Sequence, residues 1–183
     1  MKSEIEKLAY DFAKKWHEGY YRNDNITPYI VHPISVVSTL RAWGVGDSEV
    51  IAAAYLHDLL EDTKVKESEL RQVFGLNVLM KVKKLTKDEK IQKDEYMNKI
   101  AKDADVYVSL IKYADRISNV IDFLVDGKEE YAYEYYHKAD AIYNRLSSER
   151  KALGKIFDNL RDDKEALDTI FETIKKDTNK GKK

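Results

Sequence analysis

The scarcity of chain-breaking residues constrains this fold more than any other feature of the sequence. Only 7 glycines and 2 prolines occur in 183 residues. Sheet proteins need many tight turns, which depend on glycine and proline, whereas Lys, Glu, Leu and Ala favour helices. The sequence therefore predicts an all-α protein, and its length suits one domain with a core that needs no cross-links.

Apolar residues recur at helical spacing along almost the whole chain. The first helix is expected over residues 3–21, with Ser3 as its N-cap, and the second from Pro33 to Trp43, ending at Gly44. A single domain is expected over residues 1–175, followed by a flexible basic tail at 176–183. The later helices are predicted from residue 47 or 48 through Leu60, and at 67–74, 77–85, 93–101, 106–125, 129–146 and 148–175.

Composition excludes several classes of function. The chain has no cysteine, so any metal must be held by His, Asp and Glu. The net charge of −1 argues against nucleic acid as a partner, and no glycine-rich phosphate loop occurs. No apolar run is long enough to span a membrane and no signal peptide is evident, so a cytoplasmic protein without a membrane partner is expected. The sequence leaves the oligomeric state open, a homo-oligomer included.

One acidic segment stands at the end of an apolar helix. His57 and Asp58 are followed by Glu61 and Asp62, each one helical turn further on. Ionisable groups beside the apolar run AAAYL are costly to bury unless a cation or a polar network compensates them. The segment is therefore a candidate metal site, although a pair of acids facing solvent at a helix end is the alternative.

Two further residues are candidates for the same site. His32 precedes Pro33 at the start of a helix, where it is either a ligand, an N-cap or a partly buried core residue. Asp115 lies on an apolar helix, with Asn119 one turn later, and its alternative role is an internal salt bridge to Arg116 or Arg145. Two histidines and two aspartates from separate helices make an oxygen and nitrogen site suited to Mn²⁺, Fe²⁺ or Zn²⁺.

The order H…HD…D is the pattern of HD phosphohydrolases. Four sequence motifs resemble the hydrolase half of the RelA/SpoT family over roughly residues 6–146. They are WHEGYYR…TPYIVHP, AAAYLHDLLEDT, FGLNV…VKKLTK and IKYADRISN. They look most like the stand-alone small alarmone hydrolases, a group that includes the metazoan SpoT homologue. The resemblance implies an HD-domain helical bundle and Mn²⁺-dependent (p)ppGpp 3′-pyrophosphohydrolase activity that leaves GDP or GTP.

The resemblance also assigns roles to individual residues. The Glu61–Asp62 pair matches the acids that handle the attacking water, and Mn²⁺ is the implied ion, although the ligand set suits other divalent metals. The implied metal ligands are His32, His57, Asp58 and Asp115, and the implied contacts to the nucleotide substrate are Arg22, Asn119 and Tyr135.

The chain departs from the family in the loop before the first histidine ligand. The usual R-K-x-G-x-P-Y becomes RNDNITPY at residues 22–29, without the second basic residue or the glycine and one residue longer. The substrate could therefore be another nucleotide: a ppApp-type alarmone, a dNTP, a nucleoside monophosphate or NADPH. A non-catalytic nucleotide-binding module is the further alternative. Ser118 replaces a frequent histidine and is expected to matter little, while His17 either supports the site or is a satisfied core residue.

Overall fold

The computed structural model describes residues 3–180 and confirms the all-α prediction. Among these residues the chain forms helices joined by loops, the longest of which is at 17–30, and the only strand-like pairing is one isolated bridge between Tyr21 and Pro28. The helices are α1 (Glu4–Trp16), α2 (Val31–Trp43), α3 (Ser48–Leu56), α4 (Leu59–Asp62), α5 (Glu67–Leu85), α6 (Lys93–Ala101), α7 (Val106–Val125), α8 (Glu129–His137), α9 (Asp140–Ser148), α10 (Arg150–Leu153) and α11 (Lys155–Lys180).

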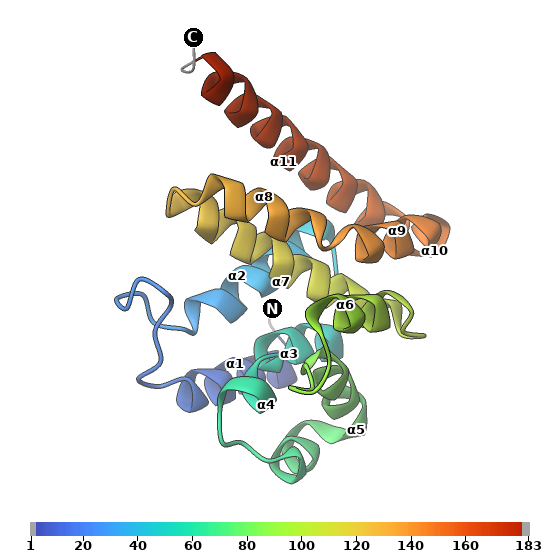
Figure 1. The fold of residues 1–183 in the computed structure, drawn as a ribbon. Helices are drawn as coiled ribbons and strands as arrows, with labels where there is room; N and C mark the ends of the chain where they lie inside the picture. The colour runs from blue at the N-terminus through green and yellow to red at the C-terminus, as the bar shows by residue number, and fades with distance from the viewer. Residues whose placement is uncertain (1–2, 181–183) are drawn as a thin grey trace.

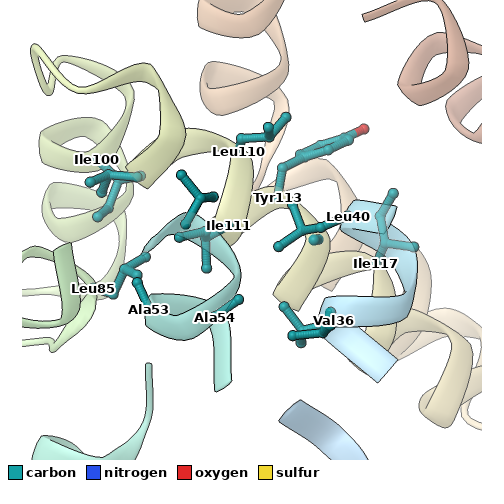
Figure 2. Packing of buried hydrophobic residues seen from close by; sticks show 14 of the residues in the cluster. Val36, Leu40, Ala53, Ala54, Leu85, Ile100, Leu110, Ile111, Tyr113 and Ile117 are labelled. Atoms are coloured by element: carbon teal, nitrogen blue, oxygen red, sulfur yellow. The ribbon is translucent and has the colours of Figure 1, made fainter. Parts of the chain in front are cut away.

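Helix α7 is the centre of the bundle. It packs against α2, α8 and α9 and also contacts α3, α5 and α6, while α1 and α5 flank α3 on the opposite side (Figure 1). Figure 2 shows the junction, where Leu110 and Ile111 of α7 meet Leu40 of α2 and Ala54 of α3. Each fully buried large aliphatic side chain there contributes about 1.5–3 kcal/mol. This packing fixes where three crossing helices place their polar residues.

Polar contacts tie the outer helices to this core. The carboxylate of Glu6, 2% exposed, accepts hydrogen bonds from Arg41 and Ser48, which joins α1, α2 and the start of α3. The indole Nε1 of Trp43 donates to Asp163 at 2.7 Å and holds α11 against the end of α2. These contacts keep the C-terminal end of α2 in place.

Several predicted helix ends differ from those observed. The helices at 93–101 and 106–125 are confirmed, as are the end of α2 at the left-handed Gly44 and a break in α5 at Gly75, with φ +96° and +79°. The first helix ends at Trp16, not at residue 21, and α2 begins two residues earlier than predicted.

The C-terminal half is more segmented than its sequence suggests. The helix predicted over 129–146 is two helices, α8 and α9, and the one over 148–175 is α10 followed by α11. Helix α11 continues to Lys180, five residues into the segment expected to be a tail, and residues 181–183 lie outside the described part of the chain. Within the described residues, no helix combines the length and apolar character needed to span a membrane.

Candidate metal centre

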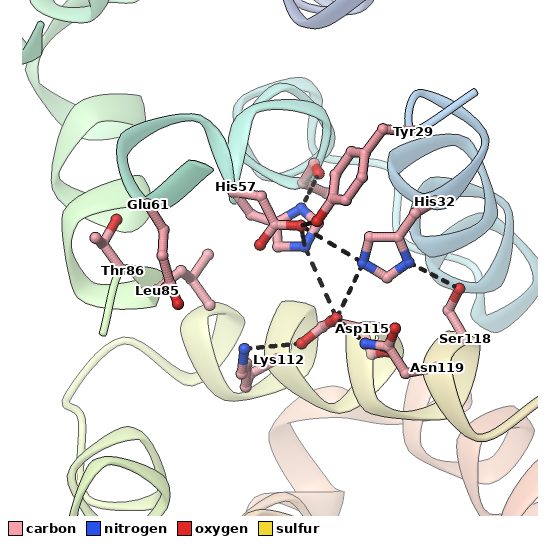
Figure 3. A network of polar contacts seen from close by, with 12 residues as sticks. Tyr29, His32, His57, Glu61, Leu85, Thr86, Lys112, Asp115, Ser118 and Asn119 are labelled. Atoms are coloured by element: carbon pink, nitrogen blue, oxygen red, sulfur yellow. Dashed lines mark hydrogen bonds and ion pairs between the residues drawn. The ribbon is translucent and has the colours of Figure 1, made fainter. Parts of the chain in front are cut away.

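Four predicted ligands converge from three places in the bundle. His32 comes from the first turn of α2, His57 and Asp58 from the junction of α3 and α4, and Asp115 from the middle of α7 (Figure 3). The Nε2 atom of His32 lies 3.1 Å from Asp115 Oδ1 and 3.6 Å from Asp58 Oδ2. The Nε2 atom of His57 lies 3.1 Å from Asp58 Oδ2 and 3.8 Å from Asp115 Oδ1.

These spacings suit a shared cation. Ligand atoms of His32, His57 and Asp58 all lie within 4.8 Å of one another, and Asp115 closes the cluster through its contacts with the two imidazoles. Adjacent ligands of an ion with bonds of roughly 2.1 Å are about 3 Å apart in octahedral geometry. The four atoms therefore need only small adjustments to bind one divalent ion.

The second nitrogen of each imidazole is held by the protein. His57 donates from Nδ1 to the carbonyl of Ala54 at 2.8 Å, and His32 Nδ1 contacts Ser118 Oγ at 3.2 Å. The bond to Ala54 places the proton of a neutral His57 on Nδ1 and leaves the Nε2 lone pair facing the carboxylates. Among the described residues this buried Nε2 has no hydrogen-bond partner. A ring nitrogen that faces two carboxylates without a hydrogen bond fits a metal ion, which would displace the proton that His57 holds at neutral pH in the metal-free chain. Holding the other nitrogen is how proteins orient histidine ligands.

The charges of the cluster favour a cation between its members. Burial raises the pKa of Asp58 and of Asp115, but neighbouring positive charges more than compensate and hold both well below the usual range. The main contributor is His57 for Asp58 and Lys112 for Asp115. Burial lowers the pKa of His57, yet Asp58 raises it to about 10. Both carboxylates are therefore ionised at neutral pH and attract positive charge.

The N-cap role considered for His32 and the arginine partner considered for Asp115 are not observed. His32 lies inside the first turn of α2 and is 2% exposed, so it is not the N-cap, which is Ile30. The cation partner of Asp115 is Lys112, with 2.8 Å from Nζ to Oδ2, rather than either of the arginines considered. Asn119 donates from Nδ2 to Asp115 Oδ1 at 2.7 Å.

The two acids that follow Asp58 point to different places. Helix α3 ends at Leu56, so His57 and Asp58 form the turn before α4 rather than lying on one continuous helix with Glu61 and Asp62. Glu61 accepts a hydrogen bond from the backbone N–H of Lys87 at 3.0 Å and lies away from the metal ligands in Figure 3. Burial and the charge of Asp58 raise the pKa of Asp62. Asp62 is therefore the acid better suited to accept a proton near neutral pH.

Tyr29 connects the metal ligands to the rest of the site. Its hydroxyl donates to Asp58 Oδ2 at 2.7 Å. Its ring lies against the imidazole of His17, with centroids 4.5 Å apart. His17 is 3% exposed, and neither of its ring nitrogens has a hydrogen-bond partner within the described residues. Burial lowers the pKa of His17 to about 4, so its imidazole is neutral at pH 7. It packs behind Tyr29 and lacks the hydrogen bonds of a satisfied core histidine.

The predicted nucleotide contacts separate into two groups. Arg22 donates to Asn119 Oδ1 at 2.8 Å and pairs with Asp122 at 2.5 Å. Arg22 and Asp122 line a cavity of about 160 Å³ that reaches His32. Tyr135 lies at the opposite side of Asn119, with its hydroxyl 3.5 Å from Asn119 Nδ2 and one ring face against the Arg116 guanidinium.

Four residues of the site were missed or undervalued in the sequence. Tyr29 lies in the turn three residues before His32. Lys112 and Ser118 lie three residues on either side of Asp115 in α7, so helical spacing places them near that residue. Asp122 lies one turn beyond Asn119 on the same helix. Ser118 contacts a metal ligand, so the expectation that its substitution matters little does not follow from its position.

This bundle, with His and Asp ligands gathered around one point, has the arrangement of an HD domain. The chain belongs to the HD-domain family, whose profile matches residues 9–154. The resemblance inferred from the sequence motifs is thereby confirmed.

Two individual relatives show a more specific similarity than the family profile does. The chain is 41% identical over 133 residues to a guanosine-3′,5′-bis(diphosphate) 3′-pyrophosphohydrolase of Aquifex aeolicus and 32% identical over 139 residues to a probable enzyme of that name from Mycoplasma pneumoniae. These matches cover 69% and 67% of this chain but 19% of each relative, so the chain is much shorter than either.

A solved structure extends the similarity to nearly the full chain. It is described as a metazoan orthologue of SpoT that hydrolyses ppGpp and plays a role in starvation responses. It superposes with a TM-score of 0.72 at 26% identity, covering 88% of this chain and 94% of that one.

Proposed function

We propose that this chain is a metal-dependent 3′-pyrophosphohydrolase of ppGpp and pppGpp. The observation that carries the proposal is the buried cluster of His32, His57, Asp58 and Asp115, with an orphaned Nε2 between two ionised carboxylates. The similarity to named ppGpp hydrolases supports the choice of substrate. Mn²⁺ is the proposed ion, because nitrogen and oxygen ligands in this mixture suit it and the resemblance to RelA/SpoT hydrolases implies it.

The reaction transfers a pyrophosphate group from the nucleotide to water. The water oxygen bonds to the phosphorus attached to ribose O3′, the O3′–P bond breaks, and O3′ takes up a proton. A divalent ion in the cluster supplies charge neutralisation and lowers the pKa of a bound water. Asp62 accepts the proton that the water loses, and Tyr29 keeps Asp58 oriented through its hydroxyl. The products are GDP or GTP and pyrophosphate.

Residues beyond the cluster are proposed to hold the nucleotide. Arg22 lines the cavity of about 160 Å³ beside His32 and donates a hydrogen bond to Asn119, and both are proposed to contact the nucleotide there. Glu61 lies on the other side of the cluster, where its carboxylate orders the turn at Lys87. It acts on the attacking water only if its side chain rotates toward Asp62.

The decisive experiment is product analysis. The purified chain is incubated with ppGpp and Mn²⁺, with EDTA and with Asp58→Ala as controls, and GDP and pyrophosphate are quantified. The expected result is equimolar release of both products that disappears in both controls. Absence of release by the metal-loaded wild type, with ppGpp intact, would overturn the proposal.

A second candidate is the same hydrolysis of another nucleotide. It is favoured by one observation: Arg22 is already paired with the Asp122 carboxylate, in a loop that lacks the family's second basic residue and glycine. A panel of ppApp, dNTPs, nucleoside monophosphates and NADPH separates the two. The candidate is rejected if ppGpp exceeds every member of the panel in kcat/KM.

A further inference from the structure

A larger pocket lies between the end of α1 and the loop that leads to α2. It holds about 400 Å³, against about 160 Å³ for the cavity beside Arg22, and within the described chain the two share no lining residue. Pockets for small molecules hold about 300–1,000 Å³. The proposed nucleotide contacts Arg22, Asn119 and Tyr135 do not line it. The pocket is therefore separate from the proposed substrate site and large enough for a small molecule.

The pocket has a buried imidazole in its wall. Of the described residues that line it, only His17 is buried, with 3% of its surface exposed. Because its pKa is about 4, this ring is neutral at pH 7 and offers one N–H donor and one acceptor. Neither nitrogen has a hydrogen-bond partner within the described residues. Buried polar groups of native proteins are nearly always hydrogen-bonded, so the orphaned imidazole indicates a ligand that supplies the missing contact.

Two exposed tyrosines form another part of the wall. Tyr20 and Tyr21 are 42% and 55% exposed, and Tyr20 lies edge-on to the imidazole of His17 with centroids 6.1 Å apart. The half-buried side chain of Ile30 adds an apolar contact. Aromatic side chains of this kind stack on nucleobases of any sequence. The pocket thus combines stacking surfaces with a hydrogen-bonding group, as a flat heteroaromatic ring requires.

The charges at the opening balance one another. Lys14 and Lys15 lie with Asp11 and Glu18, and all four side chains are exposed and without an ion pair in the described part of the chain. A phosphate group there would meet two carboxylates as well as two ammonium groups, so its net attraction would be small. The pocket therefore favours an uncharged ring system over a nucleotide.

We propose that this pocket binds a purine nucleoside and that the bound nucleoside acts on the metal cluster through Tyr29. A purine is planar and has donors and acceptors on its edge, which suits the tyrosines and His17. The ring of Tyr29 lies 4.5 Å from the imidazole of His17, and its hydroxyl donates to Asp58 at 2.7 Å. One side chain thus separates the pocket from a proposed metal ligand. The inference does not depend on which nucleotide the cluster hydrolyses.

The test is calorimetric titration of adenosine and inosine into the purified chain, with saturating GDP to occupy the nucleotide cavity. The probes carry an amino and a keto group at C6, so one of them matches His17 whichever nitrogen holds the proton. A Kd below about 1 mM is expected for at least one probe. Tyr21→Ala should weaken binding about tenfold and His17→Phe about fivefold, the losses for one stacking contact and one hydrogen bond.

The matched control is Tyr131→Ala. Tyr131 is 51% exposed, lies on α8 and does not line the pocket, so its removal should leave nucleoside affinity unchanged. Circular dichroism verifies that all variants are folded.

A second measurement tests the link to the cluster. Mn²⁺ affinity is measured by competition with a metal-binding dye, with and without saturating nucleoside. A change of about fivefold or more is expected, as for a typical coupling between two sites. Tyr29→Phe retains the ring against His17 but loses the hydrogen bond to Asp58, so it should reduce this change while nucleoside affinity is retained.

Four results would overturn the proposal. Two are a wild type that binds neither probe at millimolar concentration and equal affinities in Tyr21→Ala and Tyr131→Ala. The third is binding seen only without GDP, because the nucleoside would then occupy the nucleotide cavity. The fourth is unchanged Mn²⁺ affinity at saturating nucleoside, which would remove the link through Tyr29. None of these measurements involves turnover, so a failure of ppGpp hydrolysis is recorded separately.

Discussion

The candidate metal cluster and the proposed nucleotide end of the site share α7 but are built in different ways. His32 and His57, the two proposed histidine ligands, are 1% exposed in their side chains, and each is held by a second contact inside the bundle. At the nucleotide end, Arg22 belongs to a loop and its partner Asp122 has 48% of its side chain exposed. Rigid crossing helices hold the chemistry, whereas the groups proposed to select the substrate lie where the chain varies most easily.

The largest effect is expected from breaking the cluster itself. Asp115→Asn keeps the size of the side chain but removes the charge that faces both imidazoles and Lys112. Hydrolysis should fall about 10³-fold or more, because an ion in such a site contributes several kcal/mol. Bound metal per chain, measured by plasma mass spectrometry, should fall in parallel. His137→Ala, on an exposed histidine, is the control, and unchanged metal content in Asp115→Asn would show that the ion lies elsewhere.

The next effect concerns His17, the buried imidazole behind Tyr29, and is measured as a change in the free energy of unfolding with pH. The pKa of His17 is about 4 in the folded chain against an ordinary value of 6.5, so the unfolded chain binds more protons between these values. The contribution of neutral His17 to the free energy of unfolding is fully present above pH 6.5 and is lost as the pH falls toward 4, a difference on the order of 3 kcal/mol. His17→Phe should remove this part of the acid sensitivity. Urea midpoints at pH 7 and pH 4.5 measure it, and an identical pH dependence in the variant would refute it.

A smaller effect is expected from the hydroxyl that orients Asp58. Tyr29→Phe retains the ring against His17 but loses the 2.7 Å hydrogen bond. Metal affinity should fall about 10-fold, the lower end of the range for a residue that orients a ligand. Competition with a metal-binding dye measures the affinity, and Tyr20→Phe, at an exposed tyrosine, is the matched control. Equal losses in the two variants would mean that the hydroxyl of Tyr29 has no specific role.

The smallest effect is expected at the nucleotide end. Asp122→Asn removes the charge that holds Arg22 in the ligand-free chain. A partly exposed ion pair contributes up to about 1 kcal/mol, so its removal should lower KM for ppGpp by up to about fivefold with little change in kcat. Steady-state kinetics distinguish this from the opposite outcome, in which KM rises because Asp122 itself contacts the substrate. That outcome would assign the carboxylate to substrate recognition.

The contrast between the two regions also explains what the sequence could predict. The four ligands occur in recognisable words, and the ranges of α6 and α7 follow directly from their apolar spacing. The packing of α7 against α2 and α3 then brings His32, His57 and Asp115 together. Their convergence needs long-range contacts that no local pattern contains.

Other features depend on contacts that the sequence does not display. No glycine or proline marks the break between α8 and α9, where Ala139 is buried beneath both helices, nor the end of α3 before His57. The sequence analysis names Arg116 or Arg145 as the salt-bridge partner of Asp115, whereas the partner is Lys112, three residues earlier on the same helix. The pocket lined by Glu61, Lys87, Lys93, Lys112 and Tyr135 is formed by α4, α6, α7, α8 and the loop after α5, so only the folded chain reveals it.

The alignment of charged residues along α7 has a consequence for how this protein can change over generations. A substitution at Lys112, Asn119 or Asp122 changes one side chain, while the helix keeps the direction of all the others. Insertion or deletion of one residue between Asp115 and Asp122 rotates everything beyond it by about 100° and shifts it by 1.5 Å. Descendants of this chain should therefore vary in the amino acids of α7 but keep its length. The loop at residues 22–29 should vary in both sequence and length.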